Sequence, residues 1–359
     1  MLKVLECFAG LGACSKALER LGIEHEIVDA VEIDKYAIAS FNAIHGTNFE
    51  PQDITKWDKD LEVNLLVGGS PCQDFSVAGK NAGGDEGSGT RSSLLYEQLR
   101  IIEKLRPKYV IWENVKNLLS KKHRHNFDAY LERMTELGYK NYYQVLNAKD
   151  FGVPQNRERV FTVSMRNDIY KGFQFPPKRP LTKRLKDVLE TEVDEKYYLS
   201  DEQVAGFIHS TEKARAKGNG FRFEPTAGDG YAKCIATRPG SRQTDNFVAI
   251  KTANTKGYDL ATDGDGIDLN YPDSKTRRGR VGHGVSKTIP TGSGSQGVLD
   301  GFRIRKLTPL ECWRLMGFDD TDFYKAEKVN SNTQLYKQAG NSIVVNALEA
   351  ILEELLHGD

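Results

Sequence analysis

The stretch VLECFAGLGACSKALERLG, residues 4–22, decides the fold. Residues 4–8 form a short apolar run of the kind found in a buried strand. Gly10 and Gly12 follow, and the residues after them have the spacing of a helix that ends at Gly22. A strand, a glycine-containing turn and a helix in this order predict the first unit of an α/β sheet.

The same alternation continues to about residue 165. The predicted strands are HEIVDAVEID (25–34), NLLVGG (64–69), KYVIWEN (108–114), YYQVLNA (142–148) and RVFTVSM (159–165). The predicted helices are KYAIASFNAIHG (35–46), a segment with Leu95, Leu99 and Ile102 on one face, and FDAYLERMTELG (127–138). This rhythm predicts a doubly wound, mostly parallel sheet that binds its ligands beyond the carboxyl ends of the strands.

The rhythm fails between about residues 166 and 300. This region is rich in Gly, Thr, Asp and Lys and contains turn pairs such as DGDG (263–266) and GSGS (292–295). We therefore expect a second, smaller, irregular and β-rich domain. The tail SIVVNALEAILEELL (342–356) has the pattern of an amphipathic helix.

Composition bounds the class of protein. The 359 residues are 39% hydrophobic and 28% charged, which is typical of a globular chain, and no apolar run reaches the length of a membrane span. The five cysteines include no C-x-x-C pair, which argues against both a disulfide framework and a structural zinc site. We expect a cytoplasmic protein without a metal.

The net charge of zero gives no sign of a nucleic-acid partner, but local charge is uneven. Basic clusters occur at KKHRH (121–125), PKRPLTKRLK (177–186), SKTRRGR (274–280) and RIRK (303–306). For any one cluster alone, solvated surface is the favoured interpretation.

The loop FAGLG, residues 8–12, is compatible with a nucleoside ligand, although an ordinary tight turn is the favoured interpretation of this pattern alone. A dinucleotide fingerprint needs a third glycine where Ser15 stands, so pyrophosphate binding is disfavoured. Glu32 ends the second strand and is placed to accept hydrogen bonds from ribose hydroxyls.

Cys72 follows the strand at 64–69, where a small buried hydrophobe would be the simplest interpretation. That interpretation does not account for five glycines between residues 79 and 89, which are typical of a lid that closes on a substrate. The next strand ends with Glu113 and Asn114 at the same edge. A thiol beside a carboxyl and a nucleoside pocket indicates covalent catalysis.

Taken together, these motifs resemble the DNA (cytosine-5) methyltransferases. They are FAGLG (8–12), Glu32, SPCQDFS (70–76), ENV (113–115), QNRERVF (155–161), RKLTPLECWRLMGF (305–318) and QAGNSIVV (338–345). The resemblance covers roughly residues 4–165 and 302–346. It implies a Rossmann-like, S-adenosylmethionine-dependent enzyme that adds a cysteine to carbon 6 of a flipped cytosine and methylates carbon 5.

The resemblance also implies roles for individual residues. Cys72 would be the nucleophile, Glu113 would hold the ring and donate a proton, Arg157 would line the same site, and Arg159 would lie near the carbonyl oxygen of the base. A surface ion pair is the alternative for the arginines. The implied contacts to S-adenosylmethionine are Phe8, Gly10, Gly12, Glu32, Ile33, Asp53, Ile54, Leu94, Asn341 and Ser342. Gln73 and Ser76 would contact DNA.

The implied substrate is double-stranded DNA, and we expect a monomer. Arg277, Arg278 and Arg280 lie among glycines and turn formers, a composition suited to a loop that enters a DNA groove. We expect a catalytic domain at 1–175, a target-recognition domain at 176–324 that includes RKLTPLECWRLMGF, and a segment at 325–359 that returns to the catalytic domain.

Three other functions compete with this one. An RNA cytosine-5 methyltransferase of the same fold would not need the long insert that precedes RKLTPLECWRLMGF. A catalytically silent DNA-binding module would be expected to lack Cys72 or Glu113, and both are present. An NAD-linked enzyme would leave the SPCQ and QNRER motifs without a role.

Overall fold

The computed structural model describes residues 1–71, 91–200, 230–235 and 305–356, positions 202, 203, 206 and 209, and short strands between 226 and 298. The chain divides into two compact units. Unit 1 comprises Met1–Lys183 and Trp313–Asp359, and unit 2 comprises Arg184–Cys312. This division separates RKLTPLECWRLMGF at residue 312, within the helix α6 (Pro309–Arg314).

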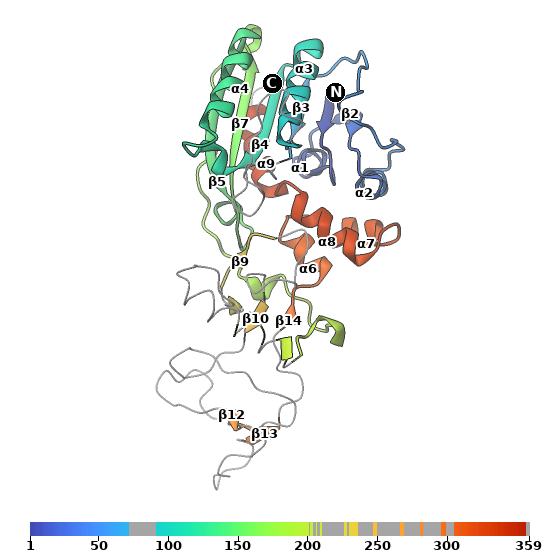
Figure 1. Ribbon diagram of the computed structural model, residues 1–359, viewed down its shortest axis with the longest axis vertical. Coiled ribbons are helices and arrows are strands. Elements are labelled where there is room, and N and C mark those ends of the chain that lie inside the picture. Colours follow the sequence, from blue (N-terminus) through green and yellow to red (C-terminus); the bar gives the residue numbers. More distant parts are fainter. Residues whose placement is uncertain are drawn as a thin grey trace. The chain divides into compact units, whose positions relative to one another are not determined.

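A six-stranded sheet in the order β2-β1-β3-β4-β7-β5 forms the centre of unit 1 (Figure 1). Neighbouring strands from β2 to β4 are parallel. The strands are β1 (Leu2–Cys7), β2 (His25–Val31), β3 (Leu65–Gly68), β4 (Tyr109–Val115), β5 (Tyr139–Asn147) and β7 (Glu158–Arg166). The predicted order of strands and helices in this region is confirmed.

β7 is antiparallel to both of its neighbours, β4 and β5. It follows β5 through a short connection that contains η3 (Ala148–Phe151) and β6 (Gln155–Asn156). A connection without a long crossover helix reverses the chain, as in a hairpin. The sheet is therefore mixed, and its reversed strand lies next to the strand that carries Glu113.

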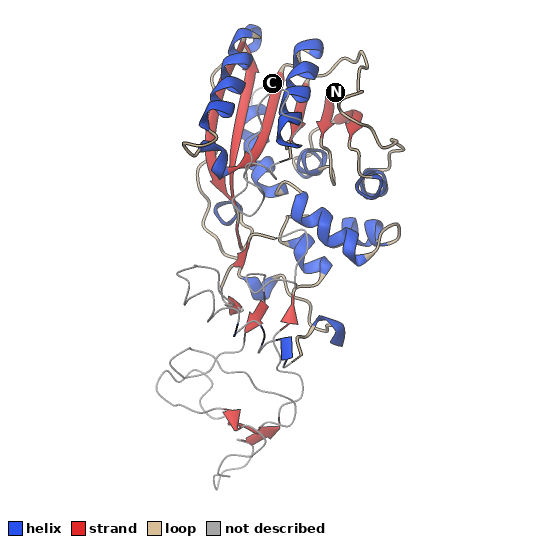
Figure 2. Cartoon of the chain, viewed as in Figure 1, coloured by secondary structure: helices blue, strands red, loops and turns tan. Residues whose placement is uncertain are grey.

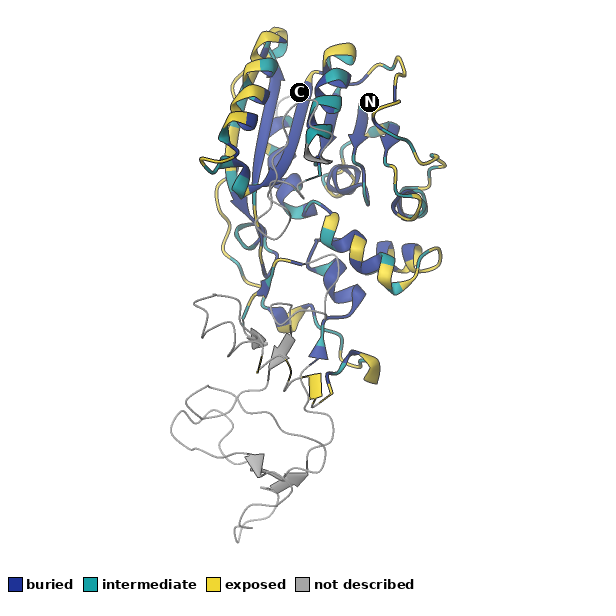
Figure 3. Cartoon of the chain, viewed as in Figure 1, coloured by how far each residue is buried: buried dark blue, intermediate teal, exposed yellow. Residues whose placement is uncertain are grey.

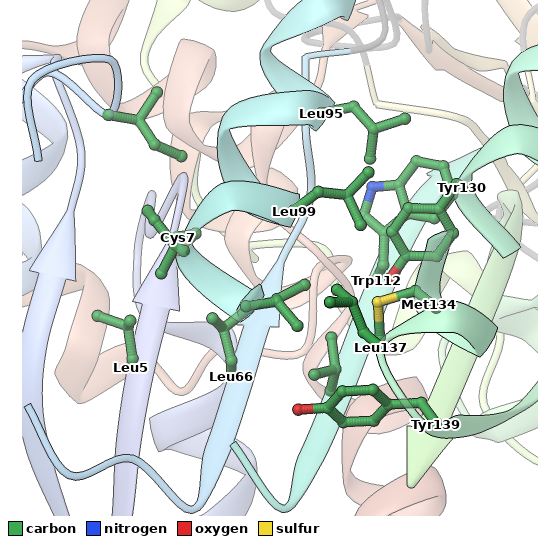
Figure 4. Packing of buried hydrophobic residues seen from close by; sticks show 14 of the residues in the cluster. Leu5, Cys7, Leu66, Leu95, Leu99, Trp112, Tyr130, Met134, Leu137 and Tyr139 are labelled. Atoms are coloured by element: carbon green, nitrogen blue, oxygen red, sulfur yellow. The ribbon is translucent and has the colours of Figure 1, made fainter. Parts of the chain in front are cut away.

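Helices cover both faces of the sheet (Figure 2). α3 (Leu95–Leu105) and α4 (Arg124–Glu136) pack on one face, and α1 (Ala13–Arg20) and α9 (Val345–Leu356) pack together on the other. Side chains from β1, β3, β4, α3 and α4 form the main apolar cluster. Figure 4 shows Leu66, Leu99, Trp112 and Tyr130 in this cluster. The Trp112 and Tyr130 ring centroids are 4.2 Å apart.

A buried acid holds the start of α1. Gly12, the residue before this helix, has φ +75° and no capping side chain. The carboxylate of Glu6 instead accepts hydrogen bonds from the Ser15 backbone N–H (3.0 Å) and hydroxyl (2.5 Å). A side chain at Gly12 would lie only 2.1 Å from His45 Nε2. The glycine loop is therefore held by Glu6 of β1 and packed against His45 of α2 (Lys35–His45).

The C-terminal helices belong to unit 1. α7 (Asp320–Glu327) and α8 (Asn332–Asn341) both contact α2. Lys16 is buried between α1 and α7 and forms ion pairs with Asp319 at 3.0 Å and Asp322 at 3.1 Å. Gln338 of α8 accepts a hydrogen bond from the hydroxyl of Ser40 at 3.0 Å. These contacts bring the end of the chain onto the first helices.

Unit 2 is largely irregular where it is described. Its short strands β8, β10 and β14 form one sheet and β11, β12 and β13 form another, and their bounds are β8 (Thr226–Ala227), β10 (Phe247–Ala249), β14 (Arg305–Lys306), β11 (Gly266–Asp268), β12 (Val281–Gly282) and β13 (Gln296–Val298). Arg305, from the basic cluster RIRK, is buried and binds Glu311 through two nitrogens at 2.9 and 2.8 Å. Part of that cluster is thus structural. β9 (Ala232–Lys233) is also short.

Among the described helices, none combines the length and apolar character that a membrane crossing requires.

Candidate active site

An acid and an arginine from neighbouring strands meet at one edge of the sheet. Glu113 lies near the end of β4, and Arg159 lies near the start of the antiparallel β7, opposite Val115. Arg159 Nε is 3.1 Å from Glu113 Oε1, and only 8% of Glu113 is exposed. Because the pair is nearly buried, water screens it little. The predicted catalytic acid and the predicted base-contacting arginine are therefore in direct contact.

Ser70 fixes the chain just before Cys72. The buried hydroxyl of Ser70 accepts hydrogen bonds from Trp112 Nε1 at 3.0 Å and Asn114 Nδ2 at 3.1 Å. Trp112 and Asn114 flank Glu113 on β4. A Cβ atom at Gly69 would lie 3.4 Å from Glu113 Oε2, so the backbone there runs past the carboxylate. Residues 69–71 therefore lead the chain from β3 past the Glu113 carboxylate.

Arg157 is buried and faces the C-terminal segment. Its guanidinium donates to the carbonyl oxygens of Gly340 at 3.3 Å and Ser342 at 2.9 Å. These carbonyls flank Asn341, the last residue of α8. Arg157 therefore joins the turn around Asn341 to the sheet edge that carries Glu113.

A small pocket opens beside these groups. It holds about 220 Å³ of empty space, part of which is open to solvent. Three charged and five apolar side chains line it: Glu113, Arg157, Arg159, Leu146, Ala148, Phe161, Val344 and Ala347. The two arginines thus share one pocket with Glu113, although Arg157 bonds backbone carbonyls and Arg159 pairs with the acid.

The second part of the candidate site surrounds Glu32. Its carboxylate accepts hydrogen bonds from the backbone N–H groups of Gly10 at 3.1 Å and Asp34 at 2.9 Å. Burial raises the pKa of Glu32 above its usual value, and these two N–H groups oppose the increase. The adjacent Ile33 is 69% exposed. A fixed carboxylate beside an exposed apolar side chain suits a ribose next to a flat ring.

Other predicted cofactor residues lie in the loop after β1 and in the loop after α2, where the Gln52 N–H donates to the Glu32 carbonyl at 2.7 Å. Phe8 has φ +53° and Gly10 has φ +55°, so the backbone turns sharply where β1 ends. Asp53 accepts hydrogen bonds from the Thr55 N–H at 3.0 Å and hydroxyl at 2.8 Å, which orders the loop that contains Ile54. Ile54 is buried, and the half-buried Leu94 packs against the same apolar cluster.

Several predicted residues lie outside the described residues. They are Cys72, Gln73, Ser76, the glycine run at 79–89, and Arg277, Arg278 and Arg280. In the part of the chain that is described, no group of three or more His, Cys, Asp or Glu side chains could hold a metal ion.

Sequence reasoning missed two residues that organise the site. Ser70 was within the SPCQDFS motif, but its role depends on Trp112 and Asn114 of another strand. Lys337 of α8 donates a hydrogen bond to Asp34, the residue that caps α2 and orients Glu32. The helical pattern of residues 332–341 gave no signal of this long-range contact.

The known proteins that this chain resembles include DNA methyltransferases of bacteria and phages. The family model for C-5 cytosine-specific DNA methylase matches residues 2–357. The chain is 33% identical to the orphan methyltransferase M.SPRI of Bacillus phage SPR, with 99% of this chain and 98% of the relative covered. It is 35% identical to the type II methyltransferase M2.ScrFI of Lactococcus lactis subsp. cremoris, with 99% of each covered.

Solved structures show the same fold at lower identity. The S. pombe Dnmt2 methyltransferase superposes with a TM-score of 0.68 and 20% identity, covering 99% of this chain and 98% of that one. The Spodoptera frugiperda DNMT2 mutant gives a TM-score of 0.68 and 19% identity, with 99% and 100% covered. The fold and the family match together show that this chain belongs to the C-5 cytosine-specific DNA methylases, the DNA (cytosine-5) methyltransferases.

Proposed function

We propose that this enzyme methylates carbon 5 of a cytosine flipped out of double-stranded DNA, through a covalent adduct with Cys72. The observation that carries the proposal is the arrangement of Ser70, Glu113 and Arg159 at the sheet edge. The residues just before Cys72 are bonded to the neighbours of Glu113, and Arg159 contacts the acid itself. The groups proposed to hold a cytosine ring therefore lie on two adjacent strands, and Ser70, two residues before Cys72 in the sequence, is bonded to one of these strands.

Carbon 5 of cytosine is a weak nucleophile, so the reaction needs a preceding addition. The Cys72 thiolate would attack carbon 6, forming a sulfur–carbon bond, while Glu113 donates a proton to ring nitrogen 3. The resulting enamine makes carbon 5 nucleophilic. After methylation, a base removes the carbon 5 proton and the Cys72 sulfur leaves as a thiolate. Ring nitrogen 3 returns its proton to Glu113, which restores both the ring and the acid.

The two arginines have different roles in this proposal. Arg159 contacts Glu113, which supports a role in which it donates a hydrogen bond to the carbonyl oxygen of the base. Arg157 is occupied by the carbonyls of Gly340 and Ser342, which supports a positioning role. Arg157 would hold the turn around Asn341 against the pocket.

S-adenosylmethionine supplies the electrophilic methyl group when it is bound. The residues around Glu32 suit its nucleoside portion, because an oriented carboxylate can accept from two ribose hydroxyls and Ile33 offers an exposed apolar face. The described backbone from Phe8 to Gly12 leaves room at Gly10, where an added Cβ would meet nothing closer than 3.9 Å. Phe8, Asp53, Ile54, Leu94, Asn341 and Ser342 are proposed to complete this site.

We assign target recognition to unit 2. Arg277, Arg278 and Arg280 remain the proposed base- and phosphate-contacting residues, with Gln73 and Ser76 contacting DNA near the flipped base. The target cytosine cannot be reached inside a duplex, so base flipping is part of the proposal.

The test is methyl transfer to nucleic acid by the full-length protein. Purified protein, S-adenosylmethionine and genomic DNA should give 5-methylcytosine at one recurring sequence, detected by bisulfite sequencing. Cys72→Ser should abolish the signal. Methylation of an RNA transcript but not of duplex DNA would contradict the proposal, and so would activity that persists in the Cys72 variant.

A further inference from the structure

The basic cluster KKHRH is part of a turn that no step of the proposed reaction uses. Residues 116–125 contain Lys116, Lys121, Lys122 and Arg124 and no aspartate or glutamate. Lys116, Lys121 and Lys122 are exposed. Figure 3 shows exposed residues in this turn, at the lower end of α4. The turn therefore has a strong local positive charge in a chain whose net charge is zero.

The turn is anchored by its apolar residues and its backbone. Leu118 and Phe127 are fully buried in the main apolar cluster. The His123 N–H donates to the Ser120 carbonyl at 3.0 Å, and the Arg124 N–H donates to the same oxygen at 2.9 Å. The lysines therefore lie on an ordered backbone, which lowers the entropic cost of binding an anion there.

The turn follows the carboxyl end of β4, the strand end that carries Glu113. Lys116 forms an ion pair with Glu158 at 3.0 Å, and Glu158 directly precedes Arg159 on β7. The lysines are thus connected to the same sheet edge as the candidate active site. A strand of DNA that delivers a base to Glu113 has phosphates on both sides of that base.

The four cations are not equivalent. Arg124 is held by Asp128 at 2.8 Å and lies over the rings of Phe127 and Tyr143, and Lys116 is paired with Glu158. In the part of the chain that the structure describes, Lys121 has no ion-pair partner. Lys121 is therefore the cation of this turn best placed to receive an external anion, and Lys122 is its exposed neighbour.

We propose that Lys121 and Lys122 form a phosphate-contacting site for the DNA backbone next to the flipped base. This inference rests on the proposed function for its choice of DNA as the partner. A lysine ammonium is a compact point charge that neutralises a phosphate without reading sequence. The site contributes affinity and register, and it leaves the choice of sequence to unit 2.

The test compares two double variants of the full-length protein. Lys121→Ala with Lys122→Ala removes two charges at the carboxyl edge of the sheet. Lys108→Ala with Lys140→Ala removes two exposed charges at the opposite edge, because Lys108 precedes β4 and Lys140 lies near the start of β5. Binding to a labelled mixed-sequence DNA duplex is measured by fluorescence anisotropy between about 50 and 200 mM salt.

Each lost phosphate contact lowers the slope of log affinity against log salt by about 0.9. We expect the 121/122 variant to lose one to two units of slope and the 108/140 variant to keep the parent slope, with unchanged S-adenosylmethionine affinity in both. Equal slopes in the two variants, or a parent protein that does not bind the duplex, would overturn the inference. If DNA is bound with the expected slopes but never methylated, only the proposed function fails.

Discussion

Arg159 Nε lies 3.1 Å from Glu113 Oε1, at the edge of the sheet where β4 ends and the antiparallel β7 begins. This contact places an acidic and a basic side chain at one pocket, which Arg157 also lines. In the proposed reaction, Glu113 donates the proton and Arg159 contacts the base.

Glu113→Gln should lower the rate of methylation by about 100- to 10,000-fold, because the amide keeps the shape of the side chain but cannot transfer a proton. Single-turnover rates at saturating DNA and S-adenosylmethionine measure the effect. Glu132→Gln, on the exposed surface of α4, is the matched control and should leave the rate unchanged. A Glu113→Gln enzyme within about threefold of the parent would show that Glu113 is not the general acid.

Ser70→Ala should affect both stability and catalysis. It removes the acceptor for Trp112 Nε1 and one of two acceptors for Asn114 Nδ2, and leaving buried donors unpaired costs about 1 to 3 kcal/mol. Because Ser70 precedes Cys72 by two residues, the methylation rate should fall as well. Urea denaturation and single-turnover rates give the two measurements.

Ser164→Ala is the control for that experiment. Ser164 is also buried and donates to Asn141 at 2.7 Å, but it lies toward the opposite end of β7. It should lower the free energy of unfolding without changing the methylation rate. If the two serine variants lose activity to the same extent, the rate effect reflects stability and Ser70 has no special role.

Glu32→Gln should weaken S-adenosylmethionine binding by about 1.5 to 3 kcal/mol, the range for hydrogen bonds to a charged group. Calorimetry on the DNA-free protein measures this change, and Glu26→Gln on the exposed part of β2 is the control. Burial raises the pKa of Glu32, so the affinity of the parent should fall as the pH is lowered through that pKa. If the S-adenosylmethionine affinity changes neither with the substitution nor with pH, Glu32 does not contact the ribose.

Glu6 should make the stability of the fold depend on pH. Burial raises its pKa from 4.5 to about 7, so the native state holds the proton more tightly than the unfolded chain. This stabilising contribution is complete below the unfolded value and is lost as the pH rises through about 7. The free energy of unfolding of the parent should fall by about 2 to 3 kcal/mol between pH 5 and 8.5, relative to Glu6→Gln. Parallel pH profiles for the two proteins would contradict this assignment.

Local sequence patterns predicted the strands and helices of unit 1 because each element carries its own periodicity. The helix ends near Gly22 and Gly46 were also predictable, because glycine is the residue that most easily takes the positive φ found after many helices, and both glycines have it here. The direction of β7 was not predictable, because a buried strand has the same apolar pattern whether it runs parallel or antiparallel to its neighbour.

The candidate site was predictable only where motifs carried it. Glu32, Glu113 and Arg159 occupy positions that a motif identifies, and the structure places Glu113 beside Arg159. The supporting contacts of Ser70 and Lys337 are made to residues far along the chain, and no local pattern encodes such pairs. The basic cluster RIRK suggested exposed charge, but its residue Arg305 forms a buried ion pair with Glu311.

Covalent trapping at Cys72 tests the central claim most directly. A duplex that contains the recognition sequence with 5-fluorocytosine at the target should form an adduct stable to denaturation, because fluorine on carbon 5 cannot leave as a proton does. The full-length protein, DNA and S-adenosylmethionine are incubated, and the adduct is digested and mapped by mass spectrometry. The account predicts one adduct, on Cys72, that is absent from Cys72→Ser. An adduct on Cys7, Cys14, Cys234 or Cys312, or methylation without any trapped species, would contradict it.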